Sequence, residues 1–258
     1  MVPVASRVVP CCQERIHTAA GAGMDHDDQI TIASLNMHGG LDRRGQPFDV
    51  EAACHYLKAD VITVQEAWLQ NGQPDPLAAP ASALGAQVKR ASLAVDTTLV
   101  SLGVGPGTEP GTWGLAVLTV LPVTGYHVVG LGRAPGDPHH RAAQVVTVAV
   151  PGGKPLCVVN THLTHRYSSP VQLRRLLRHL AGGTDPTVIV GDLNMPRAAT
   201  WAVVGYSRVV RGRTYPAHRP LVQLDHVLAG RRVTGLDGEV LDPVGSDHLP
   251  IRAQLTVG

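Results

Sequence analysis

Aromatic residues are scarce in this chain, making up 3% of its 258 residues with a single Phe and three Trp. This scarcity argues against an extended platform on which many single-stranded bases would stack. The formal net charge is only +2 with thirteen His counted as neutral. The overall charge therefore does not indicate nucleic-acid binding, although it is compatible with a local basic patch.

Cysteine is also rare, and the four cysteines form neither a CxxC pair nor a zinc-finger spacing. Cys11 and Cys12 are adjacent, whereas Cys54 and Cys157 fall within a predicted helix and a predicted strand. This pattern excludes a disulfide framework and favours free thiols in a reducing compartment. It predicts a cytoplasmic protein.

Long apolar runs are missing as well. The longest, around residues 114–123, is too short to cross a bilayer, so no membrane span is predicted. Residues 1–29 lack the continuous apolar core of a secretory signal, and a clear strand pattern follows them. We predict a disordered extension over residues 1–29 and one catalytic domain over residues 30–258, large enough for a full core. Nothing indicates an obligate protein partner, and a monomer is expected.

The segment at residues 187–197 is the clearest site signal. Residues 187–190 are mostly β-branched and predict a buried strand, which runs directly into Gly191, Asp192 and Asn194. Strand ends are where α/β proteins present side chains to ligands. The alternative interpretation is an ordinary Asx-turn with Asp192 in solvent.

Two strand–helix–strand units share this arrangement. In the first, a strand ending at Asn36 is followed by a helix over residues 48–58 and a strand that ends on Glu66. In the second, a strand ending at Asn160 leads through a helix to Asp192. The separations between amide and acid are 30 and 32 residues, which suit a right-handed crossover through one helix. We predict two related halves whose strand ends meet at one cleft.

The remaining chain predicts mostly strands. Residues 71–111 are rich in Pro, Gly and Ala and predict irregular loops with one short helix over residues 77–84. Many strands with few helices favour an α/β (α+β) fold of two packed mixed sheets, each covered by helices. The further predicted strands are residues 113–119, 126–131, 143–150, 221–228, 232–240 and 249–255.

Polar residues gather at the ends of these strands and in the loops that follow. Carboxylate and amide oxygens without cysteine favour a hard cation such as Mg²⁺. A carboxylate beside an imidazole orients the ring and raises its pKa, and the chain contains two Asp–His dipeptides. The full set is Asn36, Glu66, Asn160, His162, Asp192, Asn194, Asp225, His226, Asp247 and His248.

Taken in order, six short motifs resemble those of the endonuclease/exonuclease/phosphatase superfamily. That superfamily includes deoxyribonuclease I-like nucleases, abasic-site endonucleases, deadenylases, sphingomyelinases and inositol polyphosphate 5-phosphatases. The resemblance implies a four-layer α/β sandwich and Mg²⁺-dependent phosphoester hydrolysis, with Mn²⁺ able to replace Mg²⁺. The motifs are Asn36, Gln65-Glu66, Asn160-Thr-His162-Leu, Gly191-Asp192-Leu-Asn194, Leu224-Asp225-His226 and Ser246-Asp247-His248-Leu-Pro.

The resemblance also implies metal and substrate ligands. Glu66 matches the principal metal ligand with Asn36 beside it, and Asp247 matches a contributor to a second metal position. Asn160 is assigned to substrate binding. Arg141 is assigned as a further phosphate contact, with an ordinary surface arginine as the alternative.

Five residues match the family's catalytic positions. Asp192 would activate or orient the attacking water, and Asn194 would contact a phosphate oxygen. His248, held by Asp225, would hydrogen-bond the pentacovalent phosphate, and His162 would bind phosphate or act as an acid. Together with a cation, these groups meet the needs of phosphate-ester hydrolysis.

Substrate choice is the least constrained feature. Pro196 stands where inositol 5-phosphatases tend to have Arg, and His162 stands where abasic-site endonucleases have Tyr. We predict a phosphodiesterase, specifically a nuclease acting on DNA or another nucleic acid. The alternatives are a phosphatase or phospholipase-like enzyme acting on an inositol phosphate, a lipid headgroup or a nucleotide, and a non-catalytic binding module. Segment 208–219 is interpreted either as a basic rim for a polyanion or as a solvated loop.

Overall fold

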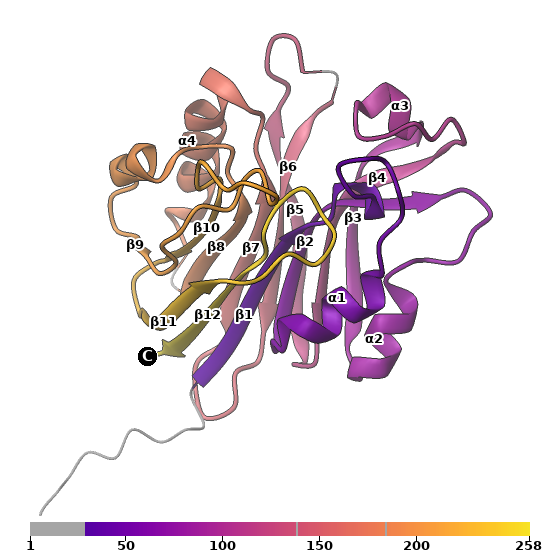
Figure 1. The fold of residues 1–258 in the computed structure, drawn as a ribbon. Coiled ribbons are helices and arrows are strands. Elements are labelled where there is room, and N and C mark those ends of the chain that lie inside the picture. The colour runs from indigo at the N-terminus through magenta and orange to yellow at the C-terminus, as the bar shows by residue number, and fades with distance from the viewer. Residues whose placement is uncertain (1–28, 138, 184) are drawn as a thin grey trace, which may run out of the picture.

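A computed structural model of the protein describes residues 29–137, 139–183 and 185–258 (Figure 1). Twelve strands in this part of the chain form two six-stranded sheets. The first sheet has the order β11 (Val233–Val240), β12 (Ile251–Val257), β1 (Gln29–Asn36), β2 (Val61–Gln70), β4 (Gly111–Thr119) and β3 (Gln87–Thr97). The second has the order β5 (Val123–Gly132), β6 (Arg141–Val148), β7 (Leu156–His162), β8 (Thr187–Asp192), β10 (Asp225–Ala229) and β9 (Ser207–Arg208).

The two sheets repeat one pattern of strand pairing. Each contains one parallel pair, β1–β2 in the first sheet and β7–β8 in the second, and all other neighbours are antiparallel. Helix α1 (Val50–Leu57) joins the first parallel pair, and η3 (Arg166–Ser168) with α4 (Ser169–Leu180) joins the second. The expectation of two related halves therefore agrees with the observed topology.

Apolar side chains bury both faces of the sheets, as parallel strands between layers require. One cluster lies between the sheets and combines Ile32 and Val61 of the first with Val158 and Val190 of the second. On the outer faces, α1 and α2 (Ala78–Leu84) cover the first sheet, and α4 with η4 (Arg197–Ala202) covers the second (Figure 1). The predicted sandwich of two mixed sheets flanked by helices is confirmed.

Residues 71–111 are more ordered than predicted. Besides the expected short helix, they contain the eleven-residue strand β3 and a one-turn helix α3 (Leu99–Leu102). The prediction of irregular loops was wrong because β3 is an edge strand that pairs only with β4 and carries Lys89, Arg90 and Ser92 in its middle. An edge strand needs only one buried face, so its apolar pattern is weak.

The boundaries of two strands differ from the prediction. Residues 221–224 precede β10 instead of belonging to it, and β2 continues to Gln70 instead of ending at Glu66. Within the described ranges, no helix has the length and apolar character needed to cross a membrane. The predicted extension over residues 1–29 lies outside the described residues, except for Gln29, which begins β1.

Candidate active site

The ends of β1 and β8 meet the middle of β2 between the two sheets. The Nδ2 atom of Asn36 lies 3.2 Å from Oε1 of Glu66 and 3.2 Å from Oδ2 of Asp192, although Asn36 and Asp192 are 156 residues apart. Asn36 is buried, so these contacts are shielded from bulk water. The amide therefore bridges the acids of both strand–helix–strand units.

Asp192 lies at the centre of the site and is 1% exposed. Its Oδ1 accepts a hydrogen bond from the backbone N–H of Asn194 at 2.8 Å. Its Oδ2 lies 3.5 Å from Nε2 of His162 and 3.7 Å from Nε2 of His248. Burial raises the pKa of Asp192 to about 7, against the opposing charge of His248. A carboxylate with this pKa exchanges protons readily near neutral pH.

Gly191 is required for this placement. Its φ is +133°, a backbone region that side chains rarely adopt. A Cβ atom at this position would overlap the carbonyl oxygen of Thr161 on the neighbouring strand and lie 3.0 Å from Nε2 of Gln65. Because the glycine permits this close approach, β8 pairs with β7 so that Asp192 stands opposite His162.

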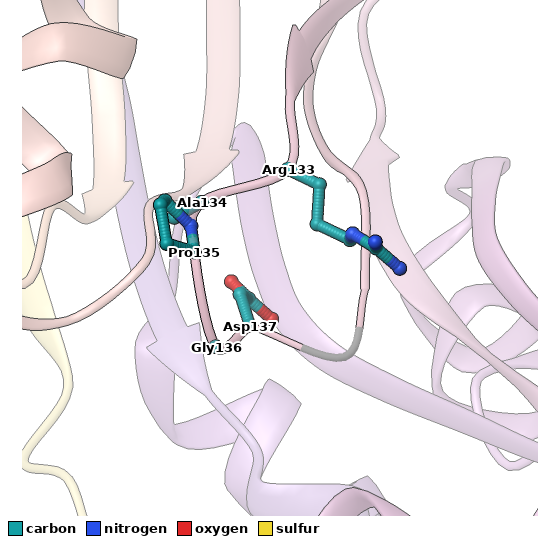
Figure 2. Close-up of a pocket in the computed structure, with 5 residues that line it drawn as sticks. All are labelled: Arg133, Ala134, Pro135, Gly136 and Asp137. Carbon is teal, nitrogen blue, oxygen red and sulfur yellow. The ribbon is translucent and has the colours of Figure 1, made fainter.

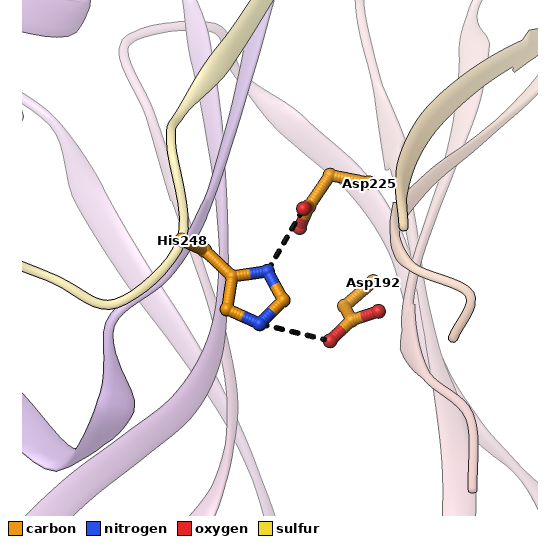
Figure 3. Close-up of side chains that lie close together, drawn as sticks. All are labelled: Asp192, Asp225 and His248. Carbon is orange, nitrogen blue, oxygen red and sulfur yellow. Dashed lines mark hydrogen bonds and ion pairs between the residues drawn. The ribbon is translucent and has the colours of Figure 1, made fainter. Parts of the chain in front are cut away.

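His248 connects Asp225 with Asp192, as Figure 3 shows. Its Nδ1 lies 2.9 Å from Oδ2 of Asp225, so the ring is held by a buried carboxylate. The ring of Tyr215 packs on it with centroids 4.7 Å apart. Burial lowers the pKa of His248, but the charges of Asp225 and Asp192 outweigh that effect and raise it to about 10. The imidazole is therefore cationic at neutral pH, with its Nε2 side directed at Asp192.

The pKa of His162 is shifted in the opposite direction from that of His248. Burial lowers its pKa well below the usual value, and the positive charge of Arg141 acts in the same direction. Its Nε2 lies 3.1 Å from Nδ2 of Asn194, and its Nδ1 is 3.8 Å from Oε1 of Glu66. The ring centroid is 5.9 Å from that of Trp113. A neutral imidazole and an imidazolium thus flank the same carboxylate.

Glu66 lies on a β-bulge within β2. The pairing with β4 shifts between Val64 and Ala67, and Glu66 has a φ of +52°. Such a bulge places an extra residue on one strand and redirects its side chain. Burial raises the pKa of Glu66, while His38 has an opposing effect. Its Oε2 is buried and has no hydrogen-bond partner among the described residues.

Asp247 approaches the same region from the loop before β12. Its Oδ1 lies 3.5 Å from Nδ1 of His38, and its charge contributes to the raised pKa of Glu66. The loop is fixed by Ser246, whose hydroxyl donates to the backbone oxygen of Asn36. The loop therefore brings both Asp247 and His248 to the strand ends of the two sheets.

The oxygen ligands of this region suit a hard divalent cation. Glu66, Asn36 and Asp247 supply two carboxylates and an amide, and the unpartnered Oε2 of Glu66 is the donor that such an ion would satisfy. Ligand atoms of Asp192, Asp225 and His248 also lie within 4.8 Å of one another. In this second group the imidazole of His248 lies between the two carboxylates.

Two residues assigned to substrate binding have other surroundings. Asn160 is fully buried, and its side chain bonds to Gln65 and Gln144 and to the backbone of Val64 and Ala116. These contacts tie the second sheet to the first, so its amide does not face the cleft. Its role is better described as structural.

Arg141 is 6% exposed, which sets it apart from an ordinary surface arginine. Its Nε donates to Oδ2 of Asp137 at 2.8 Å, and its guanidinium carbon lies 5.3 Å from the ring centroid of Trp113. The Nη1 atom is buried without a partner in the described chain. The guanidinium thus has an unsatisfied donor in the buried region that also holds His162.

Two hollows border this arrangement. One, of about 470 Å³, is lined by residues 133–137, and Figure 2 shows Arg133 and Asp137 projecting from that loop. The other, of about 400 Å³, is lined by His38, Arg43 and Arg44 together with Asp42 and residues of the α3 region. Asp137, which lines the first hollow, is bonded to Arg141, and His38, which lines the second, is paired with Asp247. Each hollow therefore has one lining residue in contact with a residue of the site.

Four contributing residues were not among the predicted site residues, although Gln65 belongs to one of the predicted motifs. Tyr215 lies within segment 208–219, and its ring packs on His248. Trp113, which was predicted as the first residue of a strand, is buried and packs against His162. Gln65 links Ser34 to Asn160, and His38 pairs with Asp247. Only Gln65 carried a local signal, because it adjoins Glu66 in a strand that is otherwise apolar.

Comparison with known proteins agrees with this geometry. The Endonuclease/Exonuclease/phosphatase family matches residues 33–248. An endonuclease/exonuclease/phosphatase from Beutenbergia cavernae is similar in structure, with a TM-score of 0.70 and 22% identity over 90% of this chain and 72% of that one. No curated protein matches the sequence.

Two further solved structures have the same fold. The human Nocturnin catalytic domain has a TM-score of 0.64 and 15% identity, covering 90% of this chain and 94% of that one. A mannosyl-6-phosphatase from Bacteroides thetaiotaomicron has a TM-score of 0.63 and 16% identity, covering 88% and 99%. At these identities the likeness establishes the fold alone.

Proposed function

Because the chain belongs to the Endonuclease/Exonuclease/phosphatase family, we propose that it is a divalent-metal-dependent phosphodiesterase that hydrolyses nucleic acid. The observation that carries this proposal is the position of Asp192. This buried carboxylate has a pKa near neutrality and lies between a neutral and a cationic imidazole. Such a set can accept a proton from water and stabilise negative charge within one small space.

Each group has a task in this proposal. Asp192, held by the Asn194 amide and by Asn36, accepts the proton of the attacking water. The cationic His248 stabilises charge on a non-bridging phosphate oxygen, and Asp225 fixes its ring. The side chain of Asn194, whose Nδ2 donates to the backbone oxygen of Leu163 and contacts His162, would turn its second N–H to another phosphate oxygen.

Glu66, Asn36 and Asp247 would hold Mg²⁺, or Mn²⁺ in its place. Bound there, the cation supplies charge neutralisation to the phosphate. Arg141 adds a fixed positive charge beside His162, with its Nη1 free to bind an oxygen. These assignments rest on donor chemistry and on buried atoms that have no partner within the described chain.

Charge around the site supports a polyanionic substrate. Arg133 lines one bordering hollow, and Arg43 and Arg44 line the other. A chain with regularly spaced phosphates would meet cations on both sides of the scissile bond, whereas a small monoester would use only the centre. Nucleic acid is therefore preferred over an inositol phosphate, a lipid headgroup or a free nucleotide.

A substrate panel tests the proposal. The purified protein with Mg²⁺ is offered supercoiled plasmid, single-stranded DNA and RNA, bis-p-nitrophenyl phosphate and p-nitrophenyl phosphate. We expect turnover of diesters, loss of turnover with EDTA, and a loss of roughly 10²–10⁴-fold in Asp192→Asn, the range for a general base. The exposed Asp237→Asn on β11 serves as the matched control.

Three results would overturn the proposal or parts of it. Absence of Mg²⁺-stimulated turnover of every ester, with Asp192→Asn equal to wild type, would indicate a binding module that keeps the fold. Faster turnover of the monoester than of any diester would indicate a phosphatase. For the metal, Mg²⁺ should raise the melting temperature of wild type but not of Glu66→Gln, and equal shifts would contradict the assignment of Glu66.

A further inference from the structure

Trp201 is an unusual surface residue. It lies on η4, the short helix that follows the loop carrying Asn194, and its side chain is 65% exposed. The other two tryptophans of the chain, Trp68 and Trp113, are 7% and 3% exposed. An exposed indole carries a large apolar area without covering any core, so such a residue often marks a binding surface.

Two arginine guanidiniums lie over the indole ring of Trp201. The guanidinium carbon of Arg208 lies 4.3 Å from the ring centroid of Trp201, and that of Arg197 lies 5.9 Å from it. Arg208 is held by Thr200, through Nε to the hydroxyl at 3.1 Å and through Nη2 to the backbone oxygen. The arrangement is therefore organised by the fold and does not consist of free side chains.

No carboxylate neutralises this pair. Among the described residues neither Arg197 nor Arg208 forms an ion pair, and Nε of Arg197 is buried without a partner. Burial lowers the pKa of Arg208, and the nearby charge of Arg197 lowers it further. Two guanidiniums held together in this way repel each other, and a bound anion would relieve that repulsion.

The arrangement adjoins the loop that carries Asn194. Arg197 follows Asn194 by three residues. The charges of Arg197 and Arg208 both lower the pKa of His226, and His226 stands opposite Gly191 in the pairing of β10 with β8. η4 thus covers the outer face of the second sheet, to which His226 turns, and it is continuous in sequence with the loop that carries Asn194.

We propose that Trp201, Arg197 and Arg208 form a binding site for a single-stranded segment of nucleic acid that flanks the scissile phosphate. An unpaired base stacks on the indole, and the guanidiniums bind the adjacent phosphates. The preference for a single strand follows from stacking, because a base within a duplex does not offer a free face. The inference rests on the proposed nuclease function and names its substrate class.

Binding without cleavage tests this site. The Asp192→Asn variant with Mg²⁺ is titrated with a fluorescently labelled single-stranded oligonucleotide, and the affinity is measured by anisotropy. Adding Trp201→Leu should weaken binding roughly tenfold, as loss of one stacked base does. Adding Arg197→Ala and Arg208→Ala should reduce the slope of log K against log salt by about 0.7 for each lost phosphate contact. The exposed Arg231→Ala, beyond the far end of β10, should do neither.

Quenching of intrinsic fluorescence gives a second readout that needs no substitution at Trp201. Because Trp68 and Trp113 are buried, iodide should quench mainly Trp201, and the oligonucleotide should protect it. Unchanged affinity in Trp201→Leu, equal affinity for duplex of the same sequence, or equal competition by poly-glutamate would each overturn the proposal. These outcomes are independent of hydrolysis, so failure of the nuclease proposal in the substrate panel is detected separately.

Discussion

Replacing Asn160 with Ala separates a structural role from a substrate-binding role at this position. Asn160 accepts a hydrogen bond from Nε2 of Gln65 at 2.7 Å. Its own amide nitrogen lies 2.9 Å from the oxygen of Ala116, 3.1 Å from that of Val64 and 3.2 Å from Oε1 of Gln144. Gln65, Val64 and Ala116 belong to the first sheet, so the amide joins the two sheets inside the core.

The expected loss of stability follows from these bonds. With two N–H groups and one carbonyl, the amide satisfies three bonds at a time, each worth about 1 kcal/mol net. The substitution also leaves buried carbonyl groups without a donor, at about 1–3 kcal/mol for an unsatisfied group. We therefore expect Asn160→Ala to lower the free energy of unfolding by about 4–6 kcal/mol, a large share of the roughly 5–15 kcal/mol typical of a domain.

Urea unfolding followed by circular dichroism measures this change. Asn71→Ala is the matched control, because Asn71 is exposed and makes one side-chain hydrogen bond, to Asp96. We expect the control to change stability by about 0.5 kcal/mol or less. A variant of near-native stability with a raised KM would refute the structural assignment and restore Asn160 to substrate binding.

Two further predictions concern the strand ends. Gly191→Ala should destabilise the protein and reduce turnover, because its Cβ would overlap the oxygen of Thr161. Gly72 also has a positive φ but faces open space, so Gly72→Ala should show only about 1 kcal/mol of backbone strain. Equal urea midpoints for the two variants would contradict the packing argument. In metal-free protein, NMR titration should find His248 protonated up to about pH 10 and His226 neutral below its usual pKa. The folded pKa of His248 is raised, so its extra stability is complete below about pH 6.5 and is lost as the pH rises through 10. Burial lowers the pKa of His226, so its extra stability is present above about pH 6.5 and is lost on acidification. Superimposable titration curves for the two imidazoles would refute both assignments.

The sequence predicted the fold well because the central strands of its two sheets are buried on both faces. Runs such as residues 61–65 and 187–190 are almost continuously β-branched, and the helical stripe between Ser169 and Leu180 is equally clear. The edge strand β3 lacked this signal, since its half-exposed side chains follow the pattern of a polar loop. Prediction from the sequence was therefore accurate where burial dictates residue type and failed where it does not.

Pairing between distant side chains was harder to predict. The spacing of the two Asp–His dipeptides does not identify their partners, because adjacent residues in an extended strand point to opposite faces. Only the family resemblance implied that Asp225 holds His248, and the structure places these two side chains 2.9 Å apart. His226 turns to the other face, where its Nε2 lies 2.8 Å from the backbone oxygen of Met195. Local sequence thus identified the residue types, while the packing of the two sheets determined their partners.

The position of Glu66 depends both on the local geometry of β2 and on the packing of the two sheets. A regular strand would send Gln65 and Glu66 to opposite faces, which leaves no simple way to use both near one cleft. The bulge at Glu66 admits an extra residue, so Gln65 reaches Ser34 and Asn160 between the sheets while Glu66 lies against Asn36 and near His162. The energetic penalty of the left-handed backbone at Glu66 is offset by the surrounding sheet, which places an acid with a free oxygen beside Asp247. Strain stored at this position is thus the structural basis of the proposed metal ligand.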